Sequence, residues 1–325
     1  MKNKKNTHLQ LFKKSYFDNV VIITGTLNSG KSMVSPIVSS LQRVEPLRKL
    51  VEIDQILHLA NLKKMKQETA FFLTRHILDK SFYEQLIGRN LNFRIGDETS
   101  IFSAKNPKEL KQRIFLPRGD HIIKNHIKKK TIFCMDTHDG MMLYHLWMNI
   151  NKNFKLINIF RNPIDTVNGF YKIGEANVKN ILFNERILLK KNNNIFPLYS
   201  LNNFKMYPKQ NPMDRVIDEA LYSLKKEYSN YKKYKNSRNC LFLENEDFSV
   251  NTDKNVSKIC KFLNTKKSKF TSRIMKRENC PREVDLKTYK EKFKKIKFLS
   301  TKKSFEKLLD FEKVFHNRKI DTLNK

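Results

Sequence analysis

The sequence has 325 residues, of which 39% are hydrophobic and 11% aromatic. Such a chain can bury a large core, and these proportions exclude a disordered protein. The 65 Lys and Arg residues outnumber the 32 Asp and Glu residues, giving a net charge of +33, which indicates either a polyanionic partner or a coding sequence biased toward lysine. Because the lysines are spread along the whole chain, we favour the compositional explanation and expect a smaller part of the charge to face an anionic cofactor.

Hydrophobic patterns predict strands that alternate with helices along the chain. The predicted strands cover residues 20–24, 50–53, 131–135, 155–160 and 240–243. The predicted helices cover residues 32–42, most of 57–128, 143–150, 163–171, a long helix that begins at Pro212, 255–263 and 304–315. Residues 190–212 are rich in Asn and Pro and are predicted to form a loop or lid. Such alternation indicates an α/β fold of three layers, α/β/α, around a mainly parallel sheet of about five strands.

The same pattern predicts one principal domain with two basic extensions. We assign residues 1–18 to an N-terminal extension and residues 19–265 to the α/β domain, with a helical insert at about 57–128. Residues 266–325 are predicted to form a helical C-terminal extension that packs on the core.

Four cysteines form no CxxC pair and lie near no histidine at a metal-binding spacing: Cys134, Cys240, Cys260 and Cys280. This arrangement argues against a zinc site or a disulfide framework. Residues 1–19 are polar and basic without an apolar segment, and no apolar run approaches the ~18 residues of a membrane span. We therefore expect a cytoplasmic protein without a membrane span.

Residues 25–32 read Gly-Thr-Leu-Asn-Ser-Gly-Lys-Ser and satisfy the phosphate-loop pattern G-x-x-x-x-G-K-[ST] in full. They lie between a predicted strand and a predicted helix, as this mechanism requires. The glycines let successive backbone amides point inward, the helix N-terminus attracts negative charge, and Lys31 can reach the outer oxygens of a phosphate or sulfate group. The loop is therefore predicted to bind a nucleotide phosphate, although by itself it does not identify the reaction.

Three further segments resemble the sulfotransferase family, whose fold is related to that of the P-loop NTPases. In residues 154–171 a strand delivers Arg161 into an Arg-Asn-Pro turn that opens a helix, and in residues 134–140 a strand ends in Thr137-His138. Residues 241–264 are similar to the strand, acidic turn and helix with which the family domain ends. The resemblance covers about residues 20–264 and implies a sulfotransferase that uses 3′-phosphoadenosine 5′-phosphosulfate (PAPS) as its sulfuryl donor.

The resemblance also implies roles for individual residues. His138 would act as the catalytic base that removes the acceptor proton, and Lys31 would stabilise the departing phosphate. Arg161 would bind the 3′-phosphate, near Asn168 and Gly169. The loop residues expected to hold the 5′-phosphosulfate are Gly25, Leu27, Asn28, Ser29, Gly30, Lys31 and Ser32. The scheme requires no metal, and it implies an acceptor with a hydroxyl or amine group, on a glycan or a small metabolite.

Several positions differ from the family pattern. Gly169 stands where the family usually has Ser, and Asp136 replaces the Lys of its Lys-x-His segment. Lys31 stands where Thr is common, which makes the loop resemble that of an ATPase more closely. Glu52 and Asp54, near the end of the predicted second strand, are alternative bases.

Two other functions remain open from the sequence. An ATP-dependent kinase or related NTPase could use Ser32 and Asp136 around Mg²⁺. A nucleic-acid-binding ATPase is suggested by the net charge and by the aromatic residues among the lysines at 228–236, but no nucleic-acid-binding motif is present, so no nucleic-acid partner is expected.

Overall fold

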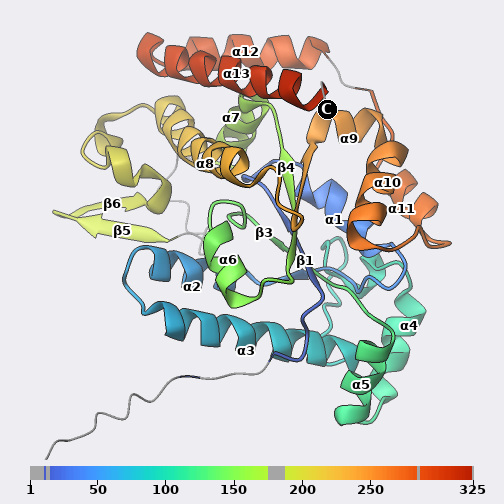
Figure 1. The fold of residues 1–325 in the computed structure, drawn as a ribbon. Coiled ribbons are helices and arrows are strands. Elements are labelled where there is room, and N and C mark those ends of the chain that lie inside the picture. The colour runs from blue at the N-terminus through green and yellow to red at the C-terminus, as the bar shows by residue number, and fades with distance from the viewer. Residues whose placement is uncertain (1–10, 12–14, 175–186, 284–285, 324–325) are drawn as a thin grey trace, which may run out of the picture.

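The computed structural model describes residues 11, 15–174, 187–283 and 286–323. Its centre is a five-stranded, entirely parallel sheet in the order β2-β3-β1-β4-β7, and Figure 1 shows helices on both of its faces. The strands are β1 (Val20–Thr24), β2 (Arg48–Lys49), β3 (Phe133–Thr137), β4 (Lys155–Phe160) and β7 (Cys240–Glu244). The predicted fold class, α/β with a parallel sheet of about five strands, is confirmed.

Every residue of β1 is buried, because helices cover the sheet on both sides. One face packs against α2 (Val51–Asn61), α3 (Gln67–Leu86) and α6 (Tyr144–Ile150). The other face packs against α1 (Lys31–Ser39), α10 (Thr252–Leu263) and α11 (Thr271–Arg277). Alternate residues of β1 supply the two cores: Val20 and Ile22 face the first set of helices, and Val21 and Ile23 face the second.

A third apolar cluster joins four helices beside the sheet. These helices are α7 (Pro163–Lys172), α8 (Pro212–Tyr234), α12 (Leu286–Leu299) and α13 (Lys302–Leu323). In Figure 1, α12 and α13 lie together at the top of the molecule, across α7 and α8. Three further helices are α4 (Pro107–Gln112), α5 (Asp120–Lys128) and α9 (Asn245–Val250), and β5 (Leu188–Lys191) and β6 (Asn194–Pro197) form an antiparallel hairpin. Short 3-10 helices cover Ile101–Ser103, Arg113–Phe115, Leu198–Asn203 and Tyr207–Lys209.

Two local predictions differ from the structure. The strand predicted at residues 50–53 is wrong: these residues begin α2, and the second strand is the two-residue β2 just before them. The segment 190–212, predicted as a loop or lid, contains most of the hairpin and two short 3-10 helices. The predicted division into domains stays a prediction, and most of its N-terminal extension lies outside the described residues.

The strand order determines where ligands can bind. β1 lies between β3 and β4, so the segments that follow these three strands meet at one edge of the sheet. From β1 the chain passes to β2 and β3 on one side of it and then crosses to β4 and β7 on the other. Such a change of direction leaves a crevice at the carboxyl ends of the strands. The phosphate loop, His138 and Arg161 all follow strands that end at this edge.

Candidate functional site

The loop that follows β1 has no room for side chains at its glycines. Gly25 and Gly30 have φ values of +150° and +97°, which favour glycine. A Cβ atom at Gly25 would lie 2.4 Å from the carbonyl oxygen of Ile159, and one at Gly30 would lie 1.8 Å from Nδ2 of Asn245. Helix α1 begins immediately afterwards, at Lys31, so its free amides face the loop. The geometry is that of an anion-binding turn at a helix N-terminus.

Lys31 is folded back onto its own loop. Its Nζ atom donates hydrogen bonds to the carbonyl oxygens of Gly25, at 2.6 Å, and Thr26, at 3.3 Å. Burial lowers the pKa of this ammonium group, against the opposing attraction of the acidic side chains around it, of which Asp136 and Glu227 contribute most. The Lys31 ammonium group therefore hydrogen-bonds to backbone carbonyls of its own loop and has carboxylates nearby.

Arg161 contacts the phosphate loop directly. It follows β4, and its Nη1 atom donates a 2.6 Å hydrogen bond to the carbonyl oxygen of Asn28. Among the described residues, the buried side-chain atoms here without a hydrogen-bond partner include Asn28 Nδ2, Ser29 Oγ and Arg161 Nε. Polar atoms buried without a partner are costly, and a bound anion with several oxygens could satisfy such donors.

The Arg-Asn-Pro turn is fixed by two hydrogen bonds of its central residue, Asn162. Asn162 caps α7 by accepting a bond from the backbone amide of Ile164 at 2.8 Å. The backbone amide of Asn162 donates to Oε1 of Glu246, in α9, at 2.9 Å. These bonds set the direction in which the chain leaves β4, and hence the position of Arg161.

Gly169 of α7 lies directly against the loop. A Cβ atom there would lie 2.8 Å from both Cβ and Cγ of Asn28, so the Asn28 side chain occupies the space that a serine would need. Its neighbour Asn168 is buried in the same helix. Leu27 packs against the apolar cluster of α7 and α8, whereas the side chain of Ser32 is exposed.

The segment after β3 is held by a carboxylate from α2. Asp54 accepts a short hydrogen bond from the Thr137 hydroxyl through Oδ1, and one of 3.1 Å from the backbone amide of His138 through Oδ2. Burial raises the pKa of Asp54 to about 7, assisted by the negative charge of Asp139 and opposed by these hydrogen bonds. Glu52, the other alternative base, is exposed at the start of the same helix.

A second group of side chains meets at Asp139. Its Oδ2 atom lies 2.7 Å from Nε2 of His58 and accepts a 2.6 Å hydrogen bond from the hydroxyl of Tyr199. Burial acts to raise the pKa of Asp139, but the two hydrogen bonds and the charge of His58 outweigh it, so the pKa is lowered. Burial likewise acts to lower the pKa of His58, and Asp139 reverses this effect, so the pKa of His58 is raised. The result is a buried ion pair beside His138.

Two adjoining cavities open at His138. One, of about 230 Å³, is lined by Lys49, Val51, Asp54, Asp136, Thr137 and His138. The other, of about 40 Å³, lies between α2 and the segment 197–199 and includes both histidines, His58 and His138. The partly exposed His138 thus borders a space into which a small group could enter.

The structure brings the predicted phosphate loop, Arg161, Asn168, Gly169 and His138 to one edge of the sheet. Sequence reasoning missed His58, Asp139, Tyr199 and the buried Glu227 of α8, whose pKa burial raises to about 8 despite the opposing effects of Thr26 and Lys31. The sequence offered one indication of this group: Asp54 and His58 are four residues apart, a spacing that places two polar side chains on the same face of a helix.

The part of the chain that the structure describes contains no group of three or more His, Cys, Asp or Glu side chains placed to hold a metal ion. Within the same residues, no helix combines the length and apolar character needed to cross a bilayer.

No protein-family model and no curated protein matches the chain. Among solved structures, it is similar to a sulfotransferase from Alicyclobacillus acidocaldarius (13% identity, 92% of this chain and 97% of that one, TM-score 0.39). It is also similar to one from Mycobacterium tuberculosis (10% identity, 85% and 76%, TM-score 0.42) and to a mouse sulfotransferase solved in complex with PAP (12% identity, 82% and 65%, TM-score 0.36). The residues of the site, rather than these similarities, carry the proposal that follows.

Proposed function

We propose that the protein is a PAPS-dependent sulfotransferase that moves a sulfuryl group to a hydroxyl or amine acceptor. The observation that carries this proposal is the contact between Arg161 and the phosphate loop, 2.6 Å from Nη1 to the Asn28 carbonyl oxygen. A nucleotide with phosphates at both its 5′ and 3′ positions needs two anion-binding groups about one sugar apart. A phosphate loop with an arginine beside it on the same edge of the sheet offers both.

The residues present fit such a nucleotide. The amides at the start of α1 and the unpartnered Ser29 hydroxyl face the loop, and Asn28 Nδ2 and Arg161 Nε are donors buried without acceptors in the described structure. We assign the 5′-phosphosulfate to residues 25–32 and the 3′-phosphate to Arg161, with Asn168 and Gly169 beside it. PAPS, when bound, would supply the sulfuryl group and a phosphate leaving group.

His138 is the proposed base. Imidazole side chains ordinarily titrate at about pH 6.5, so a histidine can accept a proton near neutral pH. The backbone of His138 is fixed through Asp54, and its side chain borders the 230 Å³ cavity, where an acceptor hydroxyl would lie. Lys31 would exchange its bonds to the Gly25 and Thr26 carbonyls for bonds to the leaving phosphate, where a fixed cation stabilises developing charge.

The small volume beside His138 supports a small or slender acceptor group. We propose a hydroxyl on a carbohydrate or a small metabolite, because the polar groups lining this cavity, Asp54, Asp136 and Lys49 among them, suit a ligand that forms hydrogen bonds.

One observation favours a second function, an ATP-dependent kinase or related NTPase. Asp136 at the end of β3 acts on Lys31 more strongly than any other carboxylate does, and this pairing of loop lysine and strand-end acid is found around Mg²⁺ in P-loop enzymes. Under this alternative Arg161 has no evident role.

A thermal-shift titration distinguishes the two. We expect 3′,5′-ADP, the desulfated product of PAPS, to stabilise the protein without added metal, and we expect Arg161→Ala to abolish most of this shift. Loss of a charged hydrogen-bond donor should weaken 3′,5′-ADP binding by roughly tenfold or more. Arg238→Ala removes the same charge from an exposed position and should leave the shift unchanged.

Stabilisation by ATP only in the presence of Mg²⁺, with no response to 3′,5′-ADP, would refute the sulfotransferase proposal and support the alternative. An equal response of the Arg161→Ala and Arg238→Ala variants would show that Arg161 does not bind the nucleotide.

A further inference from the structure

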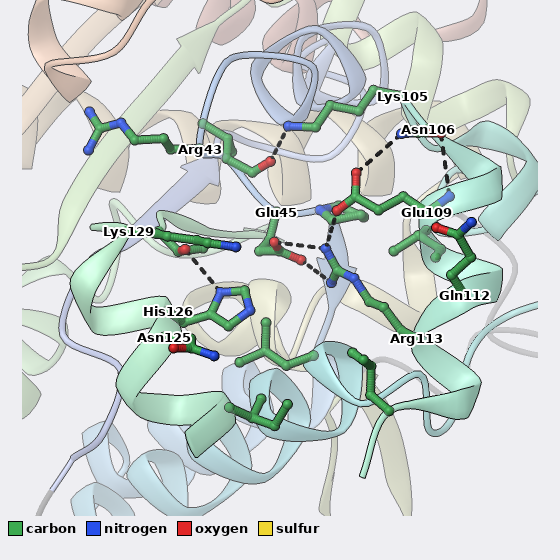
Figure 2. Close-up of a pocket in the computed structure, with 17 residues that line it drawn as sticks. Arg43, Glu45, Lys105, Asn106, Glu109, Gln112, Arg113, Asn125, His126 and Lys129 are labelled. Atoms are coloured by element: carbon green, nitrogen blue, oxygen red, sulfur yellow. Dashed lines mark hydrogen bonds and ion pairs between the residues drawn. The ribbon is translucent and has the colours of Figure 1, made fainter. Parts of the chain in front are cut away.

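A cavity of about 700 Å³ lies away from the phosphate loop. Figure 2 shows its walls: the segment 43–46 after α1, helix α4 with the residues that follow it, and helix α5. Its volume falls within the range of small-molecule binding sites in proteins.

This cavity lies at the opposite edge of the sheet from the proposed active site. Thr131, which lines it, precedes β3, whereas His138 follows β3. The segment 43–46 pairs with the same end through the parallel bridge between Val44 and Ile132. Seven residues of extended chain separate the two sites by roughly 20 Å, so one ligand of ordinary size cannot occupy both.

A cluster of ion pairs lies inside the cavity and engages both of its carboxylates, Glu45 and Glu109. Arg113 binds both carboxylate oxygens of Glu45, at 2.5 and 3.1 Å, and Oε1 of Glu109 at 3.0 Å. Lys105 donates to the carbonyl oxygens of Leu41 and Val44, at 2.7 and 2.5 Å. Both carboxylates are therefore paired with Arg113, and the positive charges of Arg113 and Lys105 balance their two negative charges.

Several other side chains of the lining can donate hydrogen bonds. Figure 2 shows the side chains of His126 and Lys129, from α5 and its C-terminal end, extending toward the Glu45–Arg113 pair. Within the described structure Lys129 forms no ion pair. Nδ1 of His126 lies 3.0 Å from the Thr131 hydroxyl, and when this nitrogen accepts the hydroxyl hydrogen, Nε2 carries the ring proton and can donate it to a ligand. The amides of Gln112 and Asn125 also line the cavity.

Another part of the wall is apolar, and four of its residues, Val44, Leu86, Leu110 and Ile122, belong to the cores beneath it. It is formed by Val44, Pro46, Leu86, Leu110, Leu116 and Ile122. A ligand would therefore contact an apolar surface on one side and a cluster of donors with an uncompensated positive charge on the other.

We propose that this cavity binds a small organic anion, in which a carboxylate or phosphate group is joined to an apolar body. The anionic group lies against Lys129 and His126, and the apolar body lies against the aliphatic wall. The site is independent of the phosphate loop and of the function proposed for it.

The test uses the full chain and two probes, octanoate and octyl phosphate, measured by isothermal titration calorimetry. We expect binding at one site, with Lys129→Glu weakening the affinity of the preferred probe by roughly tenfold, as loss of a charge-assisted hydrogen bond predicts. Which probe binds more tightly distinguishes a carboxylate from a phosphate ligand. The matched control is Lys128→Glu, an exposed neighbour outside the cavity lining, which should change the affinity less than twofold.

Saturating 3′,5′-ADP should leave the probe affinity unchanged, because the two sites are separate. The proposal is overturned if neither probe binds, if both glutamate variants lose affinity equally, or if 3′,5′-ADP displaces the probe. Lys129 is exposed, so the variant should fold, and its unfolding temperature checks this.

Discussion

Ionisable side chains with shifted pKa values gather around the phosphate loop. Burial raises the pKa of Asp54 to about 7 and that of Glu227 to about 8, and it lowers that of Lys31. Burial thus disfavours the charged form of all three groups, and this desolvation is costly to the folded state. Such clusters are characteristic of functional sites, where the chemistry requires groups that can gain or lose a proton near neutral pH.

The raised pKa of Asp54 predicts how the stability of the folded protein depends on pH. Its pKa is raised above the ordinary value of 3.8, so the folded state holds a proton that the unfolded state releases, and this contribution to stability is lost as the pH rises from about 4 to 7. The Asp54→Asn variant carries a neutral amide that resembles the protonated acid and does not ionise, so it should not lose this stability as the pH rises. The variant should unfold at a higher temperature than the wild type, by a difference that is smallest at pH 4.5 and constant above about pH 7.5.

Thermal unfolding at intervals from pH 4.5 to 8.5 measures this difference. Asp253→Asn is a suitable control, because the Asp253 carboxylate is exposed, and its difference should stay near zero throughout. A variant Asp54→Asn that is less stable than the wild type at pH 8 would contradict the prediction.

At this scale, the sequence predicts the residues that belong to continuous motifs and misses those that the fold assembles. Residues 25–32, His138 and Arg161 each follow a strand, and the structure places all of them at one edge of the sheet. The contact of Asp139 with His58 joins positions 81 residues apart, and its contact with Tyr199 spans 60 residues. No local pattern records such contacts, because they depend on how α2 and the 3-10 helix Leu198–Asn203 pack beside the segment that follows β3.

At the scale of elements, one prediction failed for a definite reason. Leu50 to Ile53 is a short apolar run that fits a strand, but Leu50, Ile53 and Leu57 also follow the spacing of one face of a helix, and all three are buried in the core of α2 and α3. The strands 20–24, 155–160 and 240–243 are predicted well, because parallel strands buried on both faces are continuous apolar runs.

The close packing of α7 on the loop gives a second prediction. In Gly169→Ser the added Cβ atom would meet Asn28 at 2.8 Å, so the substitution should lower the free energy of unfolding by about 1–3 kcal/mol, the usual cost of overpacking. Asn28 has a φ of +63°, which glycine adopts freely, so Asn28→Gly makes room for the serine without backbone strain.

Urea denaturation of both single variants and the double variant measures the coupling. The serine should cost little in the Asn28→Gly background, so the two effects are not additive. An equal cost of the serine in both backgrounds would show that Asn28 does not occupy the space in question.

At the scale of the whole molecule, the C-terminal helices complete the core. Ile296, Phe305, Leu308 and Phe311 are buried against α7 and α8. The sequence predicts a helical extension over 266–325 but delimits only one helix in it, at 304–315, inside α13; the bounds of α12 were not predicted, because its few apolar residues are separated by many lysines.

Arg318 connects the end of α13 to the sheet. It is 2% exposed, donates a 3.0 Å bond to Oε1 of Glu244 at the end of β7, and lies over the rings of Phe160 and Phe315 at 3.9 and 4.0 Å. Arg318→Met should lower the free energy of unfolding by about 3 kcal/mol, because it leaves the carboxylate of Glu244 without this partner.

The control for Arg318→Met is Lys313→Met, which breaks the exposed ion pair with Asp310 on the same helix. This change should cost less than about 1 kcal/mol in urea denaturation. Similar costs for the two variants would show that α13 is not anchored through Arg318.

The shortness of β2 affects the tendency of the protein to aggregate at high concentration. β2 lies at the edge of the sheet and has only two residues, Arg48 and Lys49, both basic. An edge strand exposes free amides and carbonyls with which a strand from another molecule can pair, and short, charged edges prevent such pairing. We therefore expect this edge to resist the strand-to-strand addition that begins aggregation, even though apolar strands fill the interior of the sheet.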